Sequence, residues 1–295
     1  MLVKIILLGS KGIVGSELLK ILKDKYEVYA FSHNDLDITN ETLLSSKLNE
    51  IRPQYLINAA AYTRVEDAEN DSTLCYEINS NAVQNIATMC KANNIHLIHF
   101  STDYIYNGEK KEPYIESDKA RPLNTYGDSK NKGDQFIMSS QCNYTIFRTS
   151  WVYGKHGHNF VKNILTKATK QNELTVVSDQ YSSPTSSLLI AQVIEIFLLK
   201  TIQRGTYLKH NQVFNLSPSG FTTWYDFACE IIKQASKIDT KYNIKIKPTS
   251  SNNYDSKVKR PSYTVLSNKK ICSYFDIDIQ NWEYYLIRFL EIYIK

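Results

Sequence analysis

MLVKIILLGSKGIVGSELLKILK, residues 1–23, places an apolar run, a glycine-rich turn and an amphipathic segment in direct succession. Residues 1–8 suit a strand buried on both faces, and residues 16–23 carry leucine and isoleucine at helical spacing. Between them, Gly9 permits a tight turn, Gly12 lets the backbone approach a ligand, and Gly15 lets the helix pack closely on the strand. Amides that point outward at the start of such a helix bind phosphate. This stretch therefore predicts a dinucleotide-binding unit.

Strand and helix patterns alternate through the next part of the chain. Strands are expected at 26–31, 55–61, 95–100 and 144–147, and helices at 41–50 and 74–92. This alternation predicts an α/β fold, a Rossmann-type doubly wound parallel sheet, with residues 1–150 as an NAD(P)-binding domain. Asn79, inside the expected helix at 74–92, has the pattern of a surface polar residue.

Strand and helix patterns alternate less regularly beyond residue 150. We expect residues 151–295 to form a smaller C-terminal substrate-binding domain, while strands near 174–178 and 212–217 join the central sheet. Helices are expected at 160–169, 188–199 and 224–237. The tract 238–261 is rich in lysine, serine and asparagine and is predicted to be a loop.

A candidate reactive centre follows the strand at 95–100. Thr102 lies where the chain leaves that strand, and Tyr126 and Lys130 are four residues apart, on one face of a helix. An ammonium beside a phenol favours the phenolate, so we expect Lys130 to lower the pKa of Tyr126 from its usual ~10. Tyr126 could then protonate a carbonyl oxygen as hydride reaches the carbon, with Thr102 bonded to the same oxygen. The alternative is an ordinary surface helix, because 21 tyrosines make this spacing common.

Composition limits the class of protein. The net charge of +5 is spread over 295 residues without a basic block, which gives no reason to expect a nucleic-acid partner. The five cysteines are odd in number and lack metal-ligand spacing, which favours reduced thiols and a cytoplasmic location. The opening apolar run is too short for a signal peptide, and no stretch approaches the length of a membrane span.

The residues after the second expected strand bear on the choice of cofactor. An acidic side chain there would bind the free hydroxyls of an adenosine ribose and repel a 2′-phosphate, but Ser32, His33 and Asn34 occupy the place. NADPH is therefore not excluded. The expected cofactor is NADPH or NADH, with a slight preference for NADPH.

Ten short motifs occur together in one order. They are Gly9-x-x-Gly12-x-x-Gly15, Asn58-Ala-Ala-Ala61, Val65-Glu-Asp-Ala-Glu69, Ser101-Thr-Asp-Tyr104, Pro122-Leu-Asn-Thr-Tyr126-Gly-Asp-Ser-Lys130, Phe147-Arg-Thr-Ser-Trp-Val-Tyr153, Asn159-Phe160, Asp179-Gln180, Pro184-Thr185 and Arg260-Pro261. The set closely resembles the dTDP-4-dehydrorhamnose reductase family of the extended short-chain dehydrogenases/reductases, in register across nearly the whole chain. The glycine turn and the Tyr-Lys spacing mark only the superfamily, whereas the later motifs are narrower.

The resemblance implies roles at the matching positions. The catalytic residues would be Thr102, Tyr126 and Lys130. The cofactor would be bound by Gly9, Lys11, Gly12, Ile13, Val14, Gly15, Asp37, Ile38, Ala59, Ala60, Ala61 and Thr63, together with Tyr126 and Lys130. The dTDP-sugar would be bound by Val65, Asp103, Trp151, Asn159 and Arg260. The implied reaction is NAD(P)H-dependent reduction of the C4 keto group of dTDP-4-dehydro-β-L-rhamnose to dTDP-L-rhamnose, in dTDP-rhamnose and polysaccharide biosynthesis.

One departure from the family pattern concerns a metal ion. Some members bind magnesium between subunits through a glutamate at the position of Glu17 and a second glutamate soon after the Pro-Thr pair. Here residues 186–189 read Ser-Ser-Leu-Leu and contain no carboxylate. A hard cation needs several oxygen ligands, so we predict no metal, and a monomer or weak homodimer.

Two other functions stay open. One is a sibling reductase or epimerase of another nucleotide-linked deoxysugar, because the shape of the pocket chooses the sugar. The other is a non-catalytic, NAD(P)-binding regulatory subunit. The intact Thr102, Tyr126 and Lys130 argue against the second, because a binding-only protein needs no proton donor.

Overall fold

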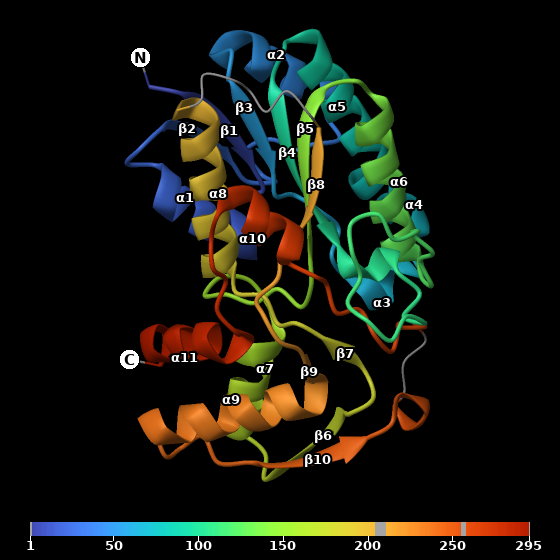
Figure 1. The fold of residues 1–295 in the computed structure, drawn as a ribbon, viewed down its shortest axis with the longest axis vertical. Helices are drawn as coiled ribbons and strands as arrows, with labels where there is room; N and C mark the ends of the chain where they lie inside the picture. The colour runs from blue at the N-terminus through green and yellow to red at the C-terminus, as the bar shows by residue number, and fades with distance from the viewer. Residues whose placement is uncertain (1, 204–210, 255–257, 295) are drawn as a thin grey trace.

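A parallel sheet forms the upper half of the computed structural model, which describes residues 2–203, 211–254 and 258–294 (Figure 1). Its described strands are β1 (Lys4–Leu8), β2 (Glu27–Phe31), β3 (Tyr55–Asn58), β4 (His96–Thr102), β5 (Asn143–Thr149) and β8 (Gln212–Asn215), in the spatial order β2-β1-β3-β4-β5-β8. In register, Leu8 lies beside Phe31 and Asn58, and Thr102 lies beside Thr149. The carboxyl ends of these strands therefore meet at one edge, and the predicted Rossmann-type fold is confirmed.

Helices cover both faces of this sheet because its strands are apolar on both sides. Ile5 and Leu7 of β1 face a core shared with α1 (Ile13–Leu22), α8 (Ser187–Gln203) and α10 (Lys269–Phe275). Ile6 and Leu8 face the opposite core, formed with α2 (Glu41–Ile51), α5 (Ala82–Ala92) and α6 (Thr125–Ser139). Figure 1 shows α1 and α8 on one side of the sheet and α5 and α6 on the other.

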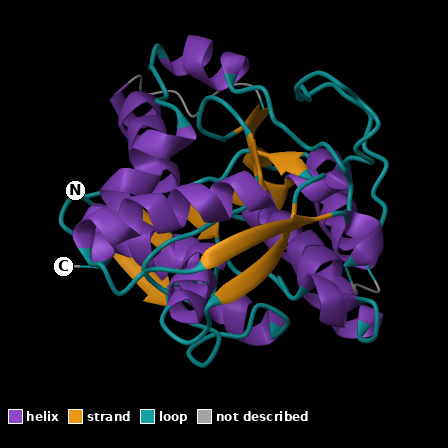
Figure 2. Ribbon diagram, turned by 90° about the horizontal axis from the view of Figure 1, so that it is seen from below, coloured by secondary structure: helices purple, strands orange, loops and turns teal. Residues whose placement is uncertain are grey.

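The second region lies below the carboxyl edge of the sheet. Its helices are α7 (Phe160–Ala168), α9 (Trp224–Ile238) and α11 (Trp282–Tyr293), and they enclose a separate core around Phe227, Ile231 and Leu286. Two further strands, β6 (Glu173–Val177) and β10 (Lys245–Thr249), pair in parallel here. Figure 2 views the molecule from this end, with the two strands in the foreground.

Two predictions about this region are wrong. The strand near 174–178 does not join the central sheet, because β6 pairs with β10 instead. The tract 238–261 is not all loop, because it contains β10. That strand, Lys-Ile-Lys-Pro-Thr, is largely exposed and lacks apolar alternation, so its sequence gives no strand signal. By contrast, β8 in the predicted tract 212–217 pairs with β5 at the edge of the central sheet.

The expected helix at 74–92 is broken into three parts. They are α4 (Ser72–Tyr76), a π-helical segment at Glu77–Asn81 and α5. The wider turn brings Asn79 inward, where its Oδ1 accepts from the Tyr62 amide at 2.9 Å and its Nδ2 donates to Ser129 Oγ at 3.1 Å. Asn79 is 1% exposed, so the interpretation of it as a surface residue is wrong. It ties the loop after β3 to helix α6.

Short elements complete the described chain. They are α3 (Val65–Ala68), the 3-10 turns Asp103–Ile105 and Ser251–Asn253, and the antiparallel pair β7 (Tyr181–Ser182) and β9 (Thr222–Thr223).

Candidate active site

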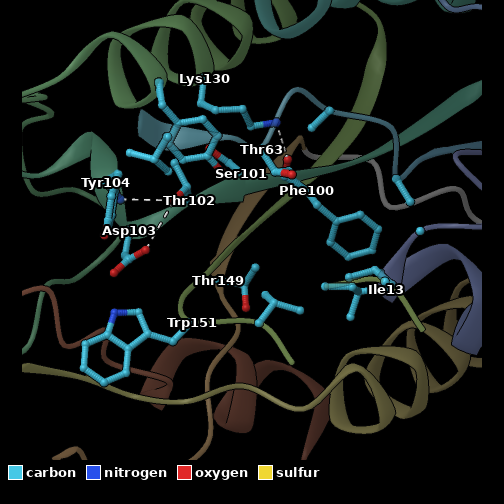
Figure 3. Close-up of a pocket in the computed structure, with 18 of the residues that line it drawn as sticks. Ile13, Thr63, Phe100, Ser101, Thr102, Asp103, Tyr104, Lys130, Thr149 and Trp151 are labelled. Carbon is cyan, nitrogen blue, oxygen red and sulfur yellow. Dashed lines mark hydrogen bonds between the residues drawn. The ribbon is translucent and has the colours of Figure 1, made fainter. Parts of the chain in front are cut away.

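A cavity of about 530 Å³ opens at the carboxyl ends of β1, β3, β4 and β5. The chain enters the sheet at β1 and then builds β2 on one side and β3 on the other, so the strand order reverses here. Crevices at such a reversal bind ligands in open α/β sheets. The lining residues are Gly12, Ile13, Val14, Ala59, Ala61, Thr63, Val65, Phe100, Ser101, Thr102, Asp103, Tyr104, Tyr126, Lys130, Thr149, Trp151, Val152, Gly157, His158 and Trp224. Figure 3 shows how residues of β4, α6 and the loop after β5 face this space.

The glycine turn forms one wall of the cavity. Gly9 has a φ of +76°, and the Gly12 amide donates to its carbonyl at 3.0 Å. A Cβ at Gly15 would lie 2.1 Å from the Gly9 carbonyl oxygen, so the helix can approach the turn only without a side chain there. Gly12 is the N-cap of α1 and has no side chain to cover the first amides of that helix. These amides can therefore bind a diphosphate.

The three proposed catalytic residues line one part of the cavity. Thr102 ends β4, and Tyr126 and Lys130 lie in the first two turns of α6, which Asn124 caps through its bond to the Gly127 amide at 2.8 Å. The Thr102 hydroxyl donates to Asp103 Oδ1 and accepts from the Tyr104 amide, both at 3.2 Å. These bonds fix the hydroxyl at the end of the strand (Figure 3).

The expectation that Lys130 lowers the pKa of Tyr126 is wrong in this arrangement. Burial raises the pKa of Tyr126, and only a hydrogen bond with Thr102 opposes the rise. Lys130 Nζ donates to the Phe100 carbonyl at 2.7 Å and lies 3.1 Å from His99 Nε2. Burial also lowers the pKa of Lys130 to about 8. The phenol thus stays protonated at neutral pH, ready to donate.

Two further features mark the side of the cavity that faces the second region. Asp103 is buried and accepts hydrogen bonds from the hydroxyls of Thr102, Ser182 and Thr264. Burial raises the pKa of its carboxyl to about 6 despite these bonds. Trp151, with a φ of +44°, stacks on Trp224 with ring centroids 3.5 Å apart. An aromatic surface with a few polar groups beside it is typical of pockets that bind small molecules.

The structure brings some predicted residues together and leaves others outside. Val65, Asp103 and Trp151 line the cavity with the catalytic trio, as do Gly12, Ile13, Val14, Ala59, Ala61 and Thr63. The predicted residues outside this lining are Gly9, Lys11, Gly15, Asp37, Ile38, Ala60, Asn159 and Arg260. Ile38 packs in the core between sheet and helices, and Asp37 accepts from the Thr39 amide at 2.9 Å.

Two of the predicted substrate-binding residues, Asn159 and Arg260, have partners within the protein. Asn159 is 6% exposed; its Oδ1 caps α7 at Lys162 and its Nδ2 donates to the Gly154 carbonyl at 2.8 Å. These bonds occupy the side chain in holding the loop. Arg260 pairs with Glu66 at 2.6 Å and borders two other cavities, of about 590 and 160 Å³. Trp224 also lines the cavity of about 160 Å³.

Several lining residues had no assigned role in the sequence. They are Phe100, Ser101, Tyr104, Thr149, Val152, Gly157, His158 and Trp224. Four of them lie inside a quoted motif and three lie within two residues of one, so each motif taken whole with its neighbours contains them. Trp224 is different: it starts α9, 73 positions after Trp151, and the sequence carries no signal for their stack.

The position matched to a magnesium ligand has a cation beside it. Glu17 lies 3.4 Å from Lys20 Nζ on the same helix. Within residues 2–203, 211–254 and 258–294, no group of three or more His, Cys, Asp or Glu side chains is placed to hold a metal ion. Over the same ranges, the helices are too short or too polar to cross a membrane.

The chain resembles known proteins along its whole length. The family model described as RmlD substrate binding domain matches residues 3–294. A dTDP-4-dehydrorhamnose reductase of Aggregatibacter actinomycetemcomitans is 34% identical over 283 residues, which cover 95% of this chain and 96% of that protein.

Solved structures agree with this match. The crystal structure of a dTDP-4-dehydrorhamnose reductase from Clostridium acetobutylicum superposes with a TM-score of 0.90 at 34% identity, over 99% of this chain and all of that one. A dTDP-4-dehydrorhamnose reductase from Bacillus anthracis, solved in complex with NADP, has a TM-score of 0.90 at 32% identity over 99% and 100% of the two chains. The resemblance carried by the sequence motifs is thus confirmed, and the chain belongs to the RmlD substrate binding domain family.

Proposed function

We propose that this protein is an NAD(P)H-dependent reductase that converts the C4 keto group of dTDP-4-dehydro-β-L-rhamnose to the alcohol of dTDP-L-rhamnose. The observation that carries the proposal is the meeting of Thr102, Tyr126 and Lys130 with the glycine turn in one cavity. A dTDP-4-dehydrorhamnose reductase covers 95% of this chain, and another was solved in complex with NADP.

The residues at the glycine turn fit a dinucleotide. A Cβ at Gly9 would lie 2.7 Å from the Ala59 backbone, and the small side chains of Ala59 and Ala61 leave the strand ends open to a flat ligand. We assign the diphosphate to Gly12, Ile13 and Val14 at the start of α1. When bound, a reduced nicotinamide supplies hydride to the carbonyl carbon.

Side chains of this protein donate the proton to the substrate oxygen and stabilise the charge that remains. Tyr126 keeps its proton at neutral pH because burial raises its pKa, and it donates that proton to the C4 oxygen. Thr102 orients the same oxygen through its hydroxyl. Lys130, four residues along α6, would hold the ribose next to the nicotinamide and, when it carries its proton, would stabilise the phenolate that remains.

The sugar and nucleotide belong to the opposite wall in this proposal. Val65, Asp103 and Trp151 border the sugar, with Trp224 extending the aromatic surface. Residues 1–150 would bind the cofactor, and residues 151–295 would supply most of the substrate site. Arg260 would meet the anionic nucleotide by exchanging its contact with Glu66. We further propose a cytoplasmic enzyme, a monomer or weak homodimer.

The test follows the absorbance of reduced nicotinamide with enzymatically prepared dTDP-4-dehydro-β-L-rhamnose, using NADPH and NADH in parallel. Wild type should oxidise the cofactor, and Tyr126→Phe should lose ~10² to 10⁴ in rate. Tyr76→Phe is the matched control, because Tyr76 bonds to Asp128 outside the cavity lining. Conversion of sugar without net oxidation would indicate an epimerase. Nucleotide binding without turnover of any keto-sugar would indicate a regulatory subunit.

A further inference from the structure

A chain of three buried polar side chains runs from the cofactor wall of the cavity to the catalytic lysine. Asn58 ends β3, His99 lies in the middle of β4, and Lys130 lies in α6; they are 1%, 0% and 2% exposed. Asn58 Nδ2 is 3.3 Å from His99 Nδ1, and His99 Nε2 is 3.1 Å from Lys130 Nζ. Burial and the neighbouring Lys130 hold the pKa of His99 well below its usual value, so the imidazole is neutral.

The backbone settles which way Asn58 faces. The Ala60 amide donates to Asn58 Oδ1 at 3.1 Å, and a backbone N–H can only donate. The oxygen of Asn58 therefore points to Ala60, and its NH₂ group points to His99. A neutral imidazole has one bare nitrogen and one N–H. Because Asn58 donates to Nδ1, the ring proton of His99 is on Nε2.

The Nε2–H group of His99 faces the lysine. Nε2–H points to Lys130 Nζ, which itself donates to the Phe100 carbonyl at 2.7 Å. An ammonium has three donors and no acceptor, whereas an uncharged amine has a lone pair that can accept from Nε2–H. All of these contacts are satisfied together only when Lys130 is uncharged. A charged Lys130 would need His99 to move its proton to Nδ1, where it would meet the Asn58 NH₂ group.

We propose that Asn58 fixes the proton of His99 on Nε2, and that His99 is thereby a positioning residue that favours the uncharged amine of Lys130 in the ligand-free protein. This deepens the proposed function, since it rests on Lys130 as the lysine of that catalytic centre. It also links the Ala59–Ala61 wall, where we place the cofactor, to the charge of the lysine.

Other charged groups act on Lys130 from the elements around it. On α6, Asp134 lies one turn further along and favours the ammonium, as does Cys75 from α4. Arg148 of β5 faces Asp134 at 3.7 Å and offsets its charge. Tyr126 is held neutral by burial, and Asp103 bonds to the hydroxyls of Thr102, Ser182 and Thr264. Burial outweighs these groups, in agreement with a lysine whose proton affinity is low.

The first experiment determines which ring nitrogen of His99 carries the proton in the wild-type protein without cofactor or substrate. In a ¹⁵N-histidine-labelled sample, NMR distinguishes protonated from bare ring nitrogens. At a pH above the Lys130 pKa of about 8, where the amine is uncharged, we expect His99 to show Nε2–H and a bare Nδ1, and His99→Gln assigns the signals. A proton on Nδ1 overturns the proposal. His96 is the internal control, because it is equally buried on β4 but bonds to Thr145 at 2.9 Å.

The second experiment moves the ring proton of His99 to the other nitrogen and so reverses the effect of the Asn58–His99–Lys130 chain. Asn58→Asp presents oxygen to both Ala60 and His99, so the ring proton should move to Nδ1 and Lys130 should gain an acceptor. The ¹³Cε signal of Lys130 should then titrate about one pH unit or more higher than in wild type. His99→Phe in the same background separates the relay from direct charge attraction. We expect the Asn58→Asp shift to be larger with His99 present, and equal shifts in both backgrounds would overturn the proposal.

Because both measurements use the ligand-free protein, they succeed or fail independently of the substrate. His96→Gln should leave the titration of Lys130 unchanged. If Asn58→Asp does not fold, the position of the His99 ring proton in the wild-type protein still tests the proposal.

Discussion

The indole of Trp151 lies flat on that of Trp224, with ring centroids 3.5 Å apart and planes inclined by 11°. Trp151 follows β5 at the carboxyl edge of the sheet, whereas Trp224 begins α9 in the second region. The stack therefore joins the two regions at the wall of the cavity.

Loss of this stack should weaken substrate binding without affecting the cofactor. We expect Trp224→Leu to raise the KM for the dTDP-sugar about two- to tenfold, because an aromatic pair contributes ~0.5–1.5 kcal/mol beyond its buried area. Steady-state kinetics give the KM, and NADPH fluorescence gives the cofactor Kd, which should stay unchanged. Phe221→Leu, an exposed aromatic three residues earlier, is the control. A matching rise in the cofactor Kd would contradict this assignment.

Two alanine variants of the glycine turn should differ in their free energy of unfolding. Gly15→Ala places a Cβ 2.1 Å from the Gly9 carbonyl, so it should lower the free energy of unfolding by about 1–3 kcal/mol. Gly12→Ala meets only the Gly9 carbonyl, at 3.2 Å, and should change it far less. Urea unfolding of both variants measures the difference. Equal destabilisation would show that close packing does not explain Gly15.

The hydroxyl of Thr102 should matter for rate. Thr102→Val keeps the shape of the side chain but removes the donor, so kcat should fall ~10²-fold. Thr102→Ser retains the hydroxyl and should keep most of the activity. The comparison uses kcat at saturating substrate and cofactor. If the serine and valine variants lose activity equally, the methyl group is the important part.

Lys130 should destabilise the protein at neutral pH. Its pKa falls from 10.5 in the unfolded chain to about 8 when folded, so the folded state binds its proton less well. Stability from this group is present above about pH 10.5 and is lost as pH falls through 8. We therefore expect inactive Lys130→Met to unfold with a free energy on the order of 1–3 kcal/mol higher than wild type at pH ~7.

The pH dependence of that difference is its own control. The advantage of Lys130→Met should shrink between about pH 8 and 10.5, where the wild-type lysine is neutral in the folded state. Urea unfolding at several pH values measures it. A constant difference across this range would mean that packing, not charge, separates the two proteins.

Local patterns in the sequence predicted the parts of the site that depend on local geometry. The turn at Gly9, the strand before it and the helix after it depend on neighbouring residues, and all three were predicted. Tyr126 and Lys130 share a helix face through spacing alone. Asn79 was misinterpreted and His99 escaped notice because their partners lie in other elements, at Ser129 and Lys130.

The electrostatics could not be predicted from spacing. The pKa of Tyr126 rises because distant segments bury the phenol, and the amino group of Lys130 is directed to the Phe100 carbonyl. Likewise, the exposed Lys245–Thr249 segment is a strand only because β6 lies beside it. Both outcomes depend on contacts between residues far apart in the chain.

The chain returns to the sheet after it has begun the second region. Helices α8 and α10 and strand β8 all follow residue 150, yet they close one face and one edge of the sheet. A fragment ending at residue 150 would expose Ile5, Leu7 and Phe147 to water. Residues 1–150 are therefore not expected to fold on their own. The intact protein should unfold in one cooperative transition, and the truncated half should aggregate.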